Sequence, residues 1–101
     1  MRFTFEADLW VWDARQADSW TFVSLPAEVS DDIRELAGAT SRPGFGSVRV
    51  WARIGDSSFA TSIFPDAARG CYVLPVKKAV RRAEALEAGD VATVTVELVE
   101  Y

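Results

Sequence analysis

The sequence predicts a single, mainly β domain over residues 1–101 that closes into a barrel and carries two short helices. Most segments alternate polar and apolar residues with the period of two that strands show. Two strand-like segments end in Leu-Pro, and each is followed by a helix-like segment, a glycine and another alternating strand. The chain of 101 residues is long enough for one hydrophobic core. The duplicated order predicts a pseudo-twofold internal repeat with one helix on each half.

The first half of the chain predicts two strands and one helix. In residues 3–12, one face carries Phe3, Phe5, Ala7, Leu9 and Val11, and the other carries Thr4, Glu6, Asp8, Trp10 and Trp12. Residues 19–25 form a second, aromatic-rich strand, and the polar segment 13–18 connects the two. Pro26 ends that strand, and we expect Ser30 to cap a short helix whose Ile33 faces the core.

The second half, after a loop at 39–46, predicts further strands and a second helix. The inward residues are Val48, Val50, Ala52 and Ile54 on one strand, then Phe59, Thr61 and Ile63 on its hairpin partner. Gly55-Asp56 is the turn between them. Residues 71–74 form a short strand that runs into a helix over 74–87. After Gly89-Asp90, the last strand turns Ala92, Val94, Val96 and Leu98 inward.

Composition narrows the functional classes. The net charge of −4 means that the protein as a whole repels nucleic acid and anionic membranes. The chain has no histidine, which excludes Ser-His-Asp and Cys-His catalysis and imidazole-bound metals. Cys71 is the single cysteine, so we expect a buried residue in a reducing compartment. We therefore expect a cytoplasmic, non-enzymatic protein with no membrane span, metal or cofactor.

The segment 74–87 reads as a helix whose charges oppose its dipole. Its first two turns carry Lys77, Lys78, Arg81 and Arg82, and its last turn carries Glu84 and Glu87. A helix macrodipole favours the reverse order by roughly 0.3–1 kcal/mol per charge.

Two interpretations of this cation cluster stay open. The cations can form a salt-bridged surface with Glu6, Asp8 or Asp66 as partners. Alternatively, they bind a small anion at the start of the helix, in a pocket completed by Arg69, Ser62 and Tyr72.

Outward tryptophans form the second set of candidates. Trp51 stands between Arg49 and Arg53, an arrangement that can stack a base, bind a phosphate or hold a protein partner. The alternative is that these arginines pair with acidic residues across the strands and the first helix covers the indole. Trp10 and Trp12 form either an exposed patch for a dimer or domain contact or, as we expect, core beneath a helix.

Several motifs spread over nearly the whole chain carry a resemblance. They are Phe5-x-Ala7-x-Leu9, Trp20-x-Phe22-Val23-x-Leu25-Pro26, Phe59-x-Thr61-Ser62-Ile63-x-Pro65, Gly70-x-Tyr72-x-Leu74-Pro75-Val76-Lys77-Lys78 and Gly89-Asp90. They resemble a family of small bacterial and archaeal proteins without established function, found alone or fused to a bacteriocin-protection (YdeI or OmpD-associated) domain.

The resemblance implies a double-split β-barrel, the architecture of AbrB-like transcription regulators and addiction antidotes, here built within one chain. Trp51-Ala52 departs from the smaller, glycine-containing pair expected at that place. The family brings no agreed catalytic residues, so the resemblance implies none here.

Three functions follow from these features. The first is a non-enzymatic module that binds a small anion at the start of the second helix. The second is a nucleic-acid-binding or regulatory barrel, which rests on fold analogy with AbrB-like proteins and is disfavoured by the net charge. The third is a protein-interaction accessory domain, either a monomer or a homodimer, whose contact uses Trp51 or the pair Trp10 and Trp12.

Overall fold

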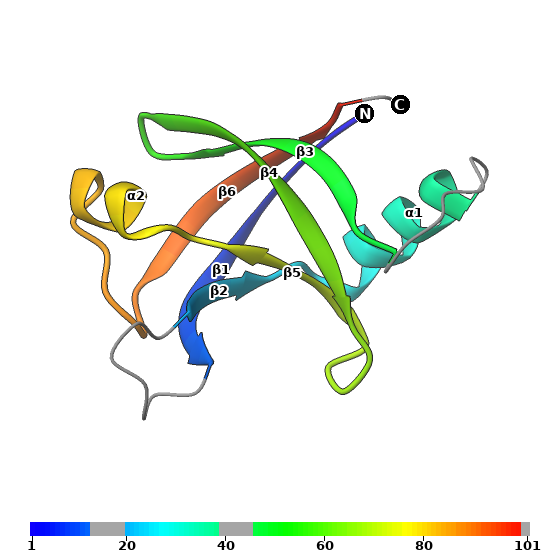
Figure 1. The fold of residues 1–101 in the computed structure, drawn as a ribbon, viewed down its shortest axis with the longest axis horizontal. Helices are drawn as coiled ribbons and strands as arrows, with labels where there is room; N and C mark the ends of the chain where they lie inside the picture. Colours follow the sequence, from blue (N-terminus) through cyan, green and yellow to red (C-terminus); the bar gives the residue numbers. More distant parts are fainter. Residues whose placement is uncertain (13–19, 39–45, 100–101) are drawn as a thin grey trace.

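A computed structural model describes residues 1–12, 20–38 and 46–99 of the chain. The elements in these ranges are β1 (Arg2–Trp12), β2 (Trp20–Ser24), α1 (Ala27–Gly38), β3 (Val48–Ile54), β4 (Ser57–Asp66), β5 (Cys71–Pro75), α2 (Lys78–Ala83) and β6 (Val91–Leu98). The strands close a barrel in the order β1-β2-β5-β4-β3-β6, and every neighbouring pair is antiparallel (Figure 1). The prediction of a mainly β barrel with two short helices is confirmed. The predicted connection 13–18 and most of the loop 39–46 lie outside the described residues.

The alternating pattern of the strands fills the barrel interior. The inward positions predicted on β3 and β6 are all buried, and Phe5 and Leu9 of β1 join them. The register sets Phe5 opposite Val94 and Ala52 opposite Val96, which brings apolar side chains from neighbouring strands together. Burial of one large aliphatic or aromatic side chain contributes about 1.5–3 kcal/mol. Burial of these side chains therefore stabilises the closed barrel.

The first helix begins earlier than the sequence suggests, and Ser30 is not its cap. α1 starts directly after Pro26, whose carbonyl oxygen accepts the first helical hydrogen bond from the Ser30 N–H at 2.9 Å. The Ser30 hydroxyl is fully buried and accepts a hydrogen bond from the backbone N–H of Tyr72 at 3.0 Å. Because proline already fixes the chain at the helix start, the serine side chain is free to satisfy a donor of β5.

The second helix is shorter than predicted and begins later. Leu74 and Pro75 belong to β5 and are buried, and the N–H of Val76 extends the pairing with β2 by donating to the Thr21 carbonyl at 2.8 Å. The chain leaves the barrel only at Lys77, the first exposed residue after this apolar run and the N-cap of α2.

The predicted reversal of charge along the second helix therefore holds only at its start, where Lys77 is the N-cap and Lys78 the first helical residue. Arg81 and Arg82 stand in the last turn of α2, where the macrodipole favours cations. Glu84 is the C-cap residue, and its carboxylate contacts the turn between β3 and β4.

The two helices lie at opposite ends of the barrel (Figure 1). α1 packs Ile33 fully into the core, with Val29 and Leu36 partly buried beside it. Val80 of α2 is partly buried against the same core. Of the helices in the described residues, none has the length and apolar character needed to cross a membrane.

Candidate functional site

The outer face of β1, β2, β5 and β4 carries a cluster of aromatic side chains. Their outward positions follow from the same alternation that sends Leu9 into the core. The register places Trp10 opposite Phe22 and Trp12 opposite Trp20. Directly opposite residues on one face have Cβ atoms about 4.5–5.5 Å apart. Four large rings therefore stand side by side on the surface of the β1–β2 hairpin.

Three of these rings form a continuous row. The ring centroids of Trp20 and Phe22 are 6.1 Å apart and the ring planes differ by 14°. Those of Trp10 and Phe22 are 5.2 Å apart, with planes inclined at 32°. Aromatic pairs of this kind contribute about 0.5–1.5 kcal/mol beyond their buried area. The indole N–H of Trp10 also donates to the Ser24 hydroxyl at 2.9 Å, which fixes the orientation of that ring.

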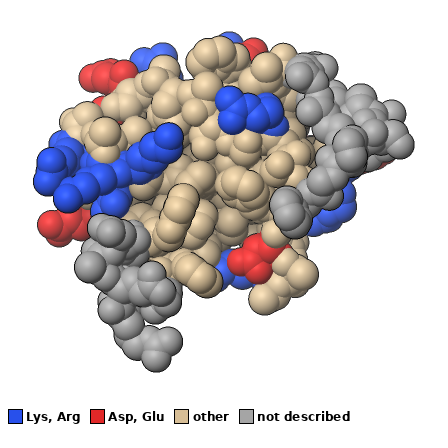
Figure 2. All heavy atoms as spheres, in the orientation of Figure 1, with Lys and Arg blue, Asp and Glu red and all other residues tan. Residues whose placement is uncertain are grey.

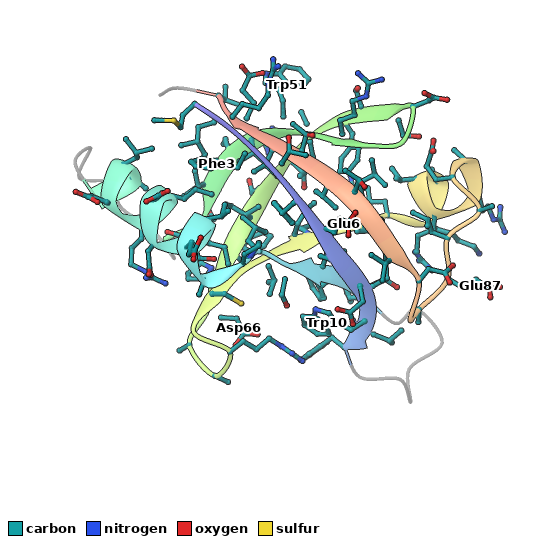
Figure 3. All side chains as sticks on the ribbon, turned by 180° about the vertical axis from the view of Figure 1, so that it is seen from behind. Phe3, Glu6, Trp10, Trp51, Asp66 and Glu87 are labelled. Carbon is teal, nitrogen blue, oxygen red and sulfur yellow. The ribbon has the colours of Figure 1, made fainter. Side chains whose placement is uncertain are left out.

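An ion pair from the turn between β4 and β5 closes one end of the row. The guanidinium carbon of Arg69 lies 3.7 Å from the centroid of the Trp10 ring, and its Nε lies 3.3 Å from Oδ2 of Asp66. Figure 3 shows Asp66 and Trp10 near one another at the lower edge of the barrel. An exposed cation–π contact contributes about 0.5–1 kcal/mol. The opposite charges compensate each other, so this end of the row has little net charge.

A groove of about 520 Å³ runs along this face, and we call it the aromatic groove. It is lined by Trp10, Trp12, Trp20, Phe22, Phe64, Pro65, Asp66, Ala67 and Val73. Trp12 is 57% exposed, Trp20 58% and Phe64 41%. Ligand pockets are typically about 300–1,000 Å³, and an apolar patch of this kind on a monomer often marks a binding site. Figure 2 shows uncharged side chains over the middle of the face that β4 and β5 form, with cations gathered over α2 at its left.

A comparison with protein families identifies the family of the chain. The model of one family matches residues 5–96, nearly the whole chain. The chain belongs to the DUF1905 family, a domain of unknown function. None of the curated proteins matches it. This membership confirms the predicted resemblance to a family without established function. It assigns no ligand to this DUF1905 domain.

The aromatic groove corrects the expectation that Trp10 and Trp12 are core residues beneath a helix. Trp10 is half-buried, but Trp12 is mostly exposed, and no helical residue is among the described residues that line the groove. A closed barrel buries its inner face, so an outward ring stays at the surface unless a helix covers it. Sequence reasoning misses Trp20 and Phe64 as site residues. The sequence feature that could have identified Trp20 is the predicted β1–β2 hairpin, because pairing of these strands places Trp20 opposite Trp12.

The cations of the predicted anion site are brought together only in part. Lys78, Arg81 and Arg82 line one hollow of about 400 Å³ beside α2. Glu87 and Asp90 line the same hollow. Two carboxylates that line the same hollow as three cations reduce the attraction of this hollow for an anion. In this DUF1905 domain the cluster is therefore a mixed-charge surface.

The other residues predicted for that site lie elsewhere. Lys77 is exposed and precedes α2, and Arg69 belongs to the ion pair beside the aromatic groove. The Ser62 hydroxyl accepts a hydrogen bond from Arg49 at 3.2 Å, and Tyr72 is buried in β5 at 4% exposure. The structure does not bring these side chains to the hollow beside α2. The described residues also contain no group of three or more His, Cys, Asp or Glu that could hold a metal ion.

Trp51 forms a second, separate surface of this DUF1905 domain. It is 53% exposed on β3, far from the aromatic groove (Figure 3), so the expected cover by the first helix is wrong. Its neighbour Arg49 donates to Ser62, and Arg53 donates to the carbonyl of Gly55 at 3.0 Å rather than to an acidic residue. Trp51 thus matches Trp20 in residue type and exposure while standing outside the groove.

Proposed function

We propose that this domain is a non-enzymatic binding module that holds a short apolar segment of a protein partner in the aromatic groove. The observation that carries the proposal is the joint exposure of Trp12, Trp20 and Phe64 beside a row of fixed rings. Full burial of a large apolar side chain contributes roughly 1.5–3 kcal/mol, and each of these half-exposed side chains forgoes about half of that. Tryptophan is also enriched among residues that dominate binding energy at protein interfaces.

The area of the groove favours a short segment over a large interface. Three half-exposed aromatic rings offer roughly 300 Å² in total, judged from the area that such side chains can bury. A stable protein–protein interface buries about 800 Å² on each partner. The groove alone is therefore too small for a stable dimer, and it suits a few residues of an extended chain.

The charge of the groove disfavours nucleic acid. Asp66 is the one charged side chain among the described residues that line it, and its ion pair with Arg69 leaves the groove without a net positive charge. The whole chain has a net charge of −4. Nucleic acid binding draws most of its affinity from cations that neutralise phosphates. The regulatory function by analogy with AbrB-like barrels therefore ranks below protein binding.

Selection from a library of random short peptides displayed on phage tests this function. We expect the domain to enrich binding peptides whose affinity falls in Trp20→Ala and is unchanged in Trp51→Ala. If no peptide is enriched, or if both variants lose affinity equally, the aromatic groove is not the contact surface. A bacteriocin-protection domain, which relatives of this chain are expected to carry, is a natural source of partner sequences to test beside the library.

We further propose a double-split barrel with a pseudo-twofold repeat, relating β1-β2-α1-β3 to β4-β5-α2-β6. The strand order supports this repeat. If β1 is exchanged with β4, β2 with β5 and β3 with β6, every pair of neighbouring strands becomes another pair of neighbouring strands or itself. The pair β1–β2 becomes β4–β5, β3–β4 becomes β6–β1, and β2–β5 and β3–β6 map onto themselves. A crystal structure would test it, because a single half-turn should superpose equivalent strands of the two halves.

Binding of a small anion beside α2 is a second candidate function. Its support is that Lys78, Arg81 and Arg82 line one hollow, and Glu87 and Asp90 weigh against it. Phosphate should raise the Tm of the wild type, and Lys78→Ala combined with Arg82→Ala should abolish that rise. A Tm that phosphate does not change would remove this candidate.

A further inference from the structure

We propose that the segment held in the aromatic groove is proline-rich and adopts the polyproline II conformation. This inference rests on the proposed function and names the class of its partner. It fails separately from that function, because the groove could hold apolar segments of other composition.

The hydrogen-bonding groups of the groove call for a ligand that accepts and does not donate. Asp66 carries the side-chain acceptors among the described lining residues, and both its oxygens are engaged. Oδ1 accepts two backbone N–H groups at 3.1 and 3.3 Å, and Oδ2 faces the Arg69 guanidinium at 3.3 Å. The indole N–H groups of Trp12 and Trp20 have no hydrogen-bond partner within the described part of the chain.

A proline-rich chain has this pattern of hydrogen-bonding groups. Each proline residue carries a backbone carbonyl but no N–H. A polyproline II helix has no internal hydrogen bonds, so its carbonyls stay available to indole donors. Sugars and ordinary peptides bring additional donors, and the side-chain acceptors that those donors would find among the described lining residues are the Asp66 oxygens, which already have partners.

The rings of the groove supply apolar surface for pyrrolidine rings. Trp20 is stacked on Phe22, and Trp12 stands directly opposite Trp20 on β1. Aromatic-lined grooves bind polyproline II segments because the ligand is already extended and loses little entropy on binding. The row of packed rings, closed by Arg69 over Trp10, is likewise fixed in advance, which lowers the cost of association.

The distance between the outermost rings sets a minimum length for the segment. Phe64 is opposite Val73 of β5, Val73 is opposite Ser24 of β2, and Trp20 comes four residues before Ser24. With about 4.8 Å between strands and 3.3 Å per residue, the two ring-bearing positions are about 16 Å apart. A polyproline II helix rises about 3.1 Å per residue, so about five residues span this distance.

Fluorescence anisotropy of labelled decaproline, titrated with the full chain, tests the inference. We expect saturable binding that is at least about tenfold weaker in Trp20→Ala and unchanged in the matched variant Trp51→Ala. Two control peptides should not bind. A Gly-Ser peptide of ten residues lacks the pyrrolidine rings, and triproline is too short to span the groove. Phe64→Ala is a second groove variant, for use if Trp20→Ala does not fold by circular dichroism.

The remaining outcomes separate this inference from the proposed function. Equal binding of the Gly-Ser peptide, or equal loss of binding in Trp51→Ala, overturns the proline assignment. If decaproline does not bind while phage-selected peptides without proline bind in a Trp20-dependent manner, the assignment is wrong and the proposed function stands. Binding of oligothymidylate in place of decaproline, with the same dependence on Trp20, overturns both, since it makes the groove a stacking platform for bases.

Discussion

A single buried hydroxyl, that of Ser30, joins the first helix to β5 and to the residue that follows β2. It accepts the backbone N–H of Tyr72 at 3.0 Å and lies 3.4 Å from the Leu25 carbonyl oxygen, to which it donates. Sequence patterns identify this serine as a helix cap, because Ser-Asp-Asp before an apolar residue is a typical helix start. They could not reveal its actual role, since Tyr72 is 42 residues away along the chain.

Replacing Ser30 with alanine is expected to destabilise the domain by about 1–3 kcal/mol, because a buried backbone donor loses its acceptor. Urea unfolding followed by circular dichroism measures this. Ser58→Ala is the matched control, since Ser58 is exposed and such substitutions usually stay within about 0.5 kcal/mol. If the two variants unfold at the same urea concentration, the role assigned to Ser30 is wrong.

At the scale of elements, α2 is attached to the barrel through the residue that ends it. The Glu84 carboxylate accepts the Ser57 hydroxyl at 2.7 Å, at the start of β4, and the backbone N–H of Asp56 at 3.3 Å, in the turn between β3 and β4. Gly55 lies directly against this carboxylate, because a Cβ at that position would overlap Oε1 of Glu84. Glu84 therefore has a structural partner in the barrel. The charge pattern of the sequence does not indicate that partner.

Glu84→Ala is expected to lower the free energy of unfolding by about 1–2 kcal/mol, since it removes hydrogen bonds to a charged group at a half-buried position. Glu87→Ala is the control, with the same change of charge three residues later at an exposed position. Thermal unfolding of both variants measures the difference. Equal stabilities would mean that the contact with the turn contributes nothing.

The strands could be predicted from sequence far better than the helix limits. Alternation gives the inward residues of β1, β3 and β6 because each strand has one buried face. Leu-Pro ends a strand at Pro26 but lies inside one at Pro75. The difference comes from β5 lying between β2 and β4, which lets Leu74 to Val76 stay buried, and local sequence carries no sign of that neighbourhood.

At the scale of the whole molecule, the pairing around the barrel is uneven. The ladder between β1 and β6 runs from Arg2 opposite Glu97 to Asp8 opposite Val91. The ladder between β2 and β5 runs from Phe22 opposite Pro75 to Ser24 opposite Val73, with one further backbone hydrogen bond beyond each end. Short ladders open at lower free energy than long ones. The aromatic groove thus lies over the more weakly paired side of the barrel.

Hydrogen exchange should reflect this difference. We expect the amide of Leu74 in β5 to exchange at least about tenfold faster than that of Val96 in β6, although both residues are fully buried. A bound ligand in the groove crosses β5 and should slow the exchange of β5 more than that of β6. Slower exchange at Leu74 than at Val96 in the free protein would contradict the uneven pairing.

The candidate site could be predicted only in fragments. The sequence marks Trp10 and Trp12 as outward residues, and the structure adds Trp20, Phe22 and Phe64 by placing β2 beside β1, with β5 and then β4 following around the barrel. The pairing of β5 with β2 joins segments that are far apart in the chain, so no local sequence pattern indicates that Phe64 of β4 lies on the same face as Trp20 of β2. The sequence singled out the cation cluster because its charges oppose the dipole of the long helix predicted over 74–87. The helix that forms is shorter, so part of this conflict between charge and dipole disappears.

The indole N–H signals of the four tryptophans in a ¹H–¹⁵N spectrum test the central claim most directly. On addition of decaproline or of a phage-selected peptide, the signals of Trp12 and Trp20 should shift. The signal of Trp10, held by Ser24, should move less, and that of Trp51 should stay in place. A shift confined to Trp51, or no shift of any indole signal at saturating peptide, would contradict the assignment of the aromatic groove as the binding surface.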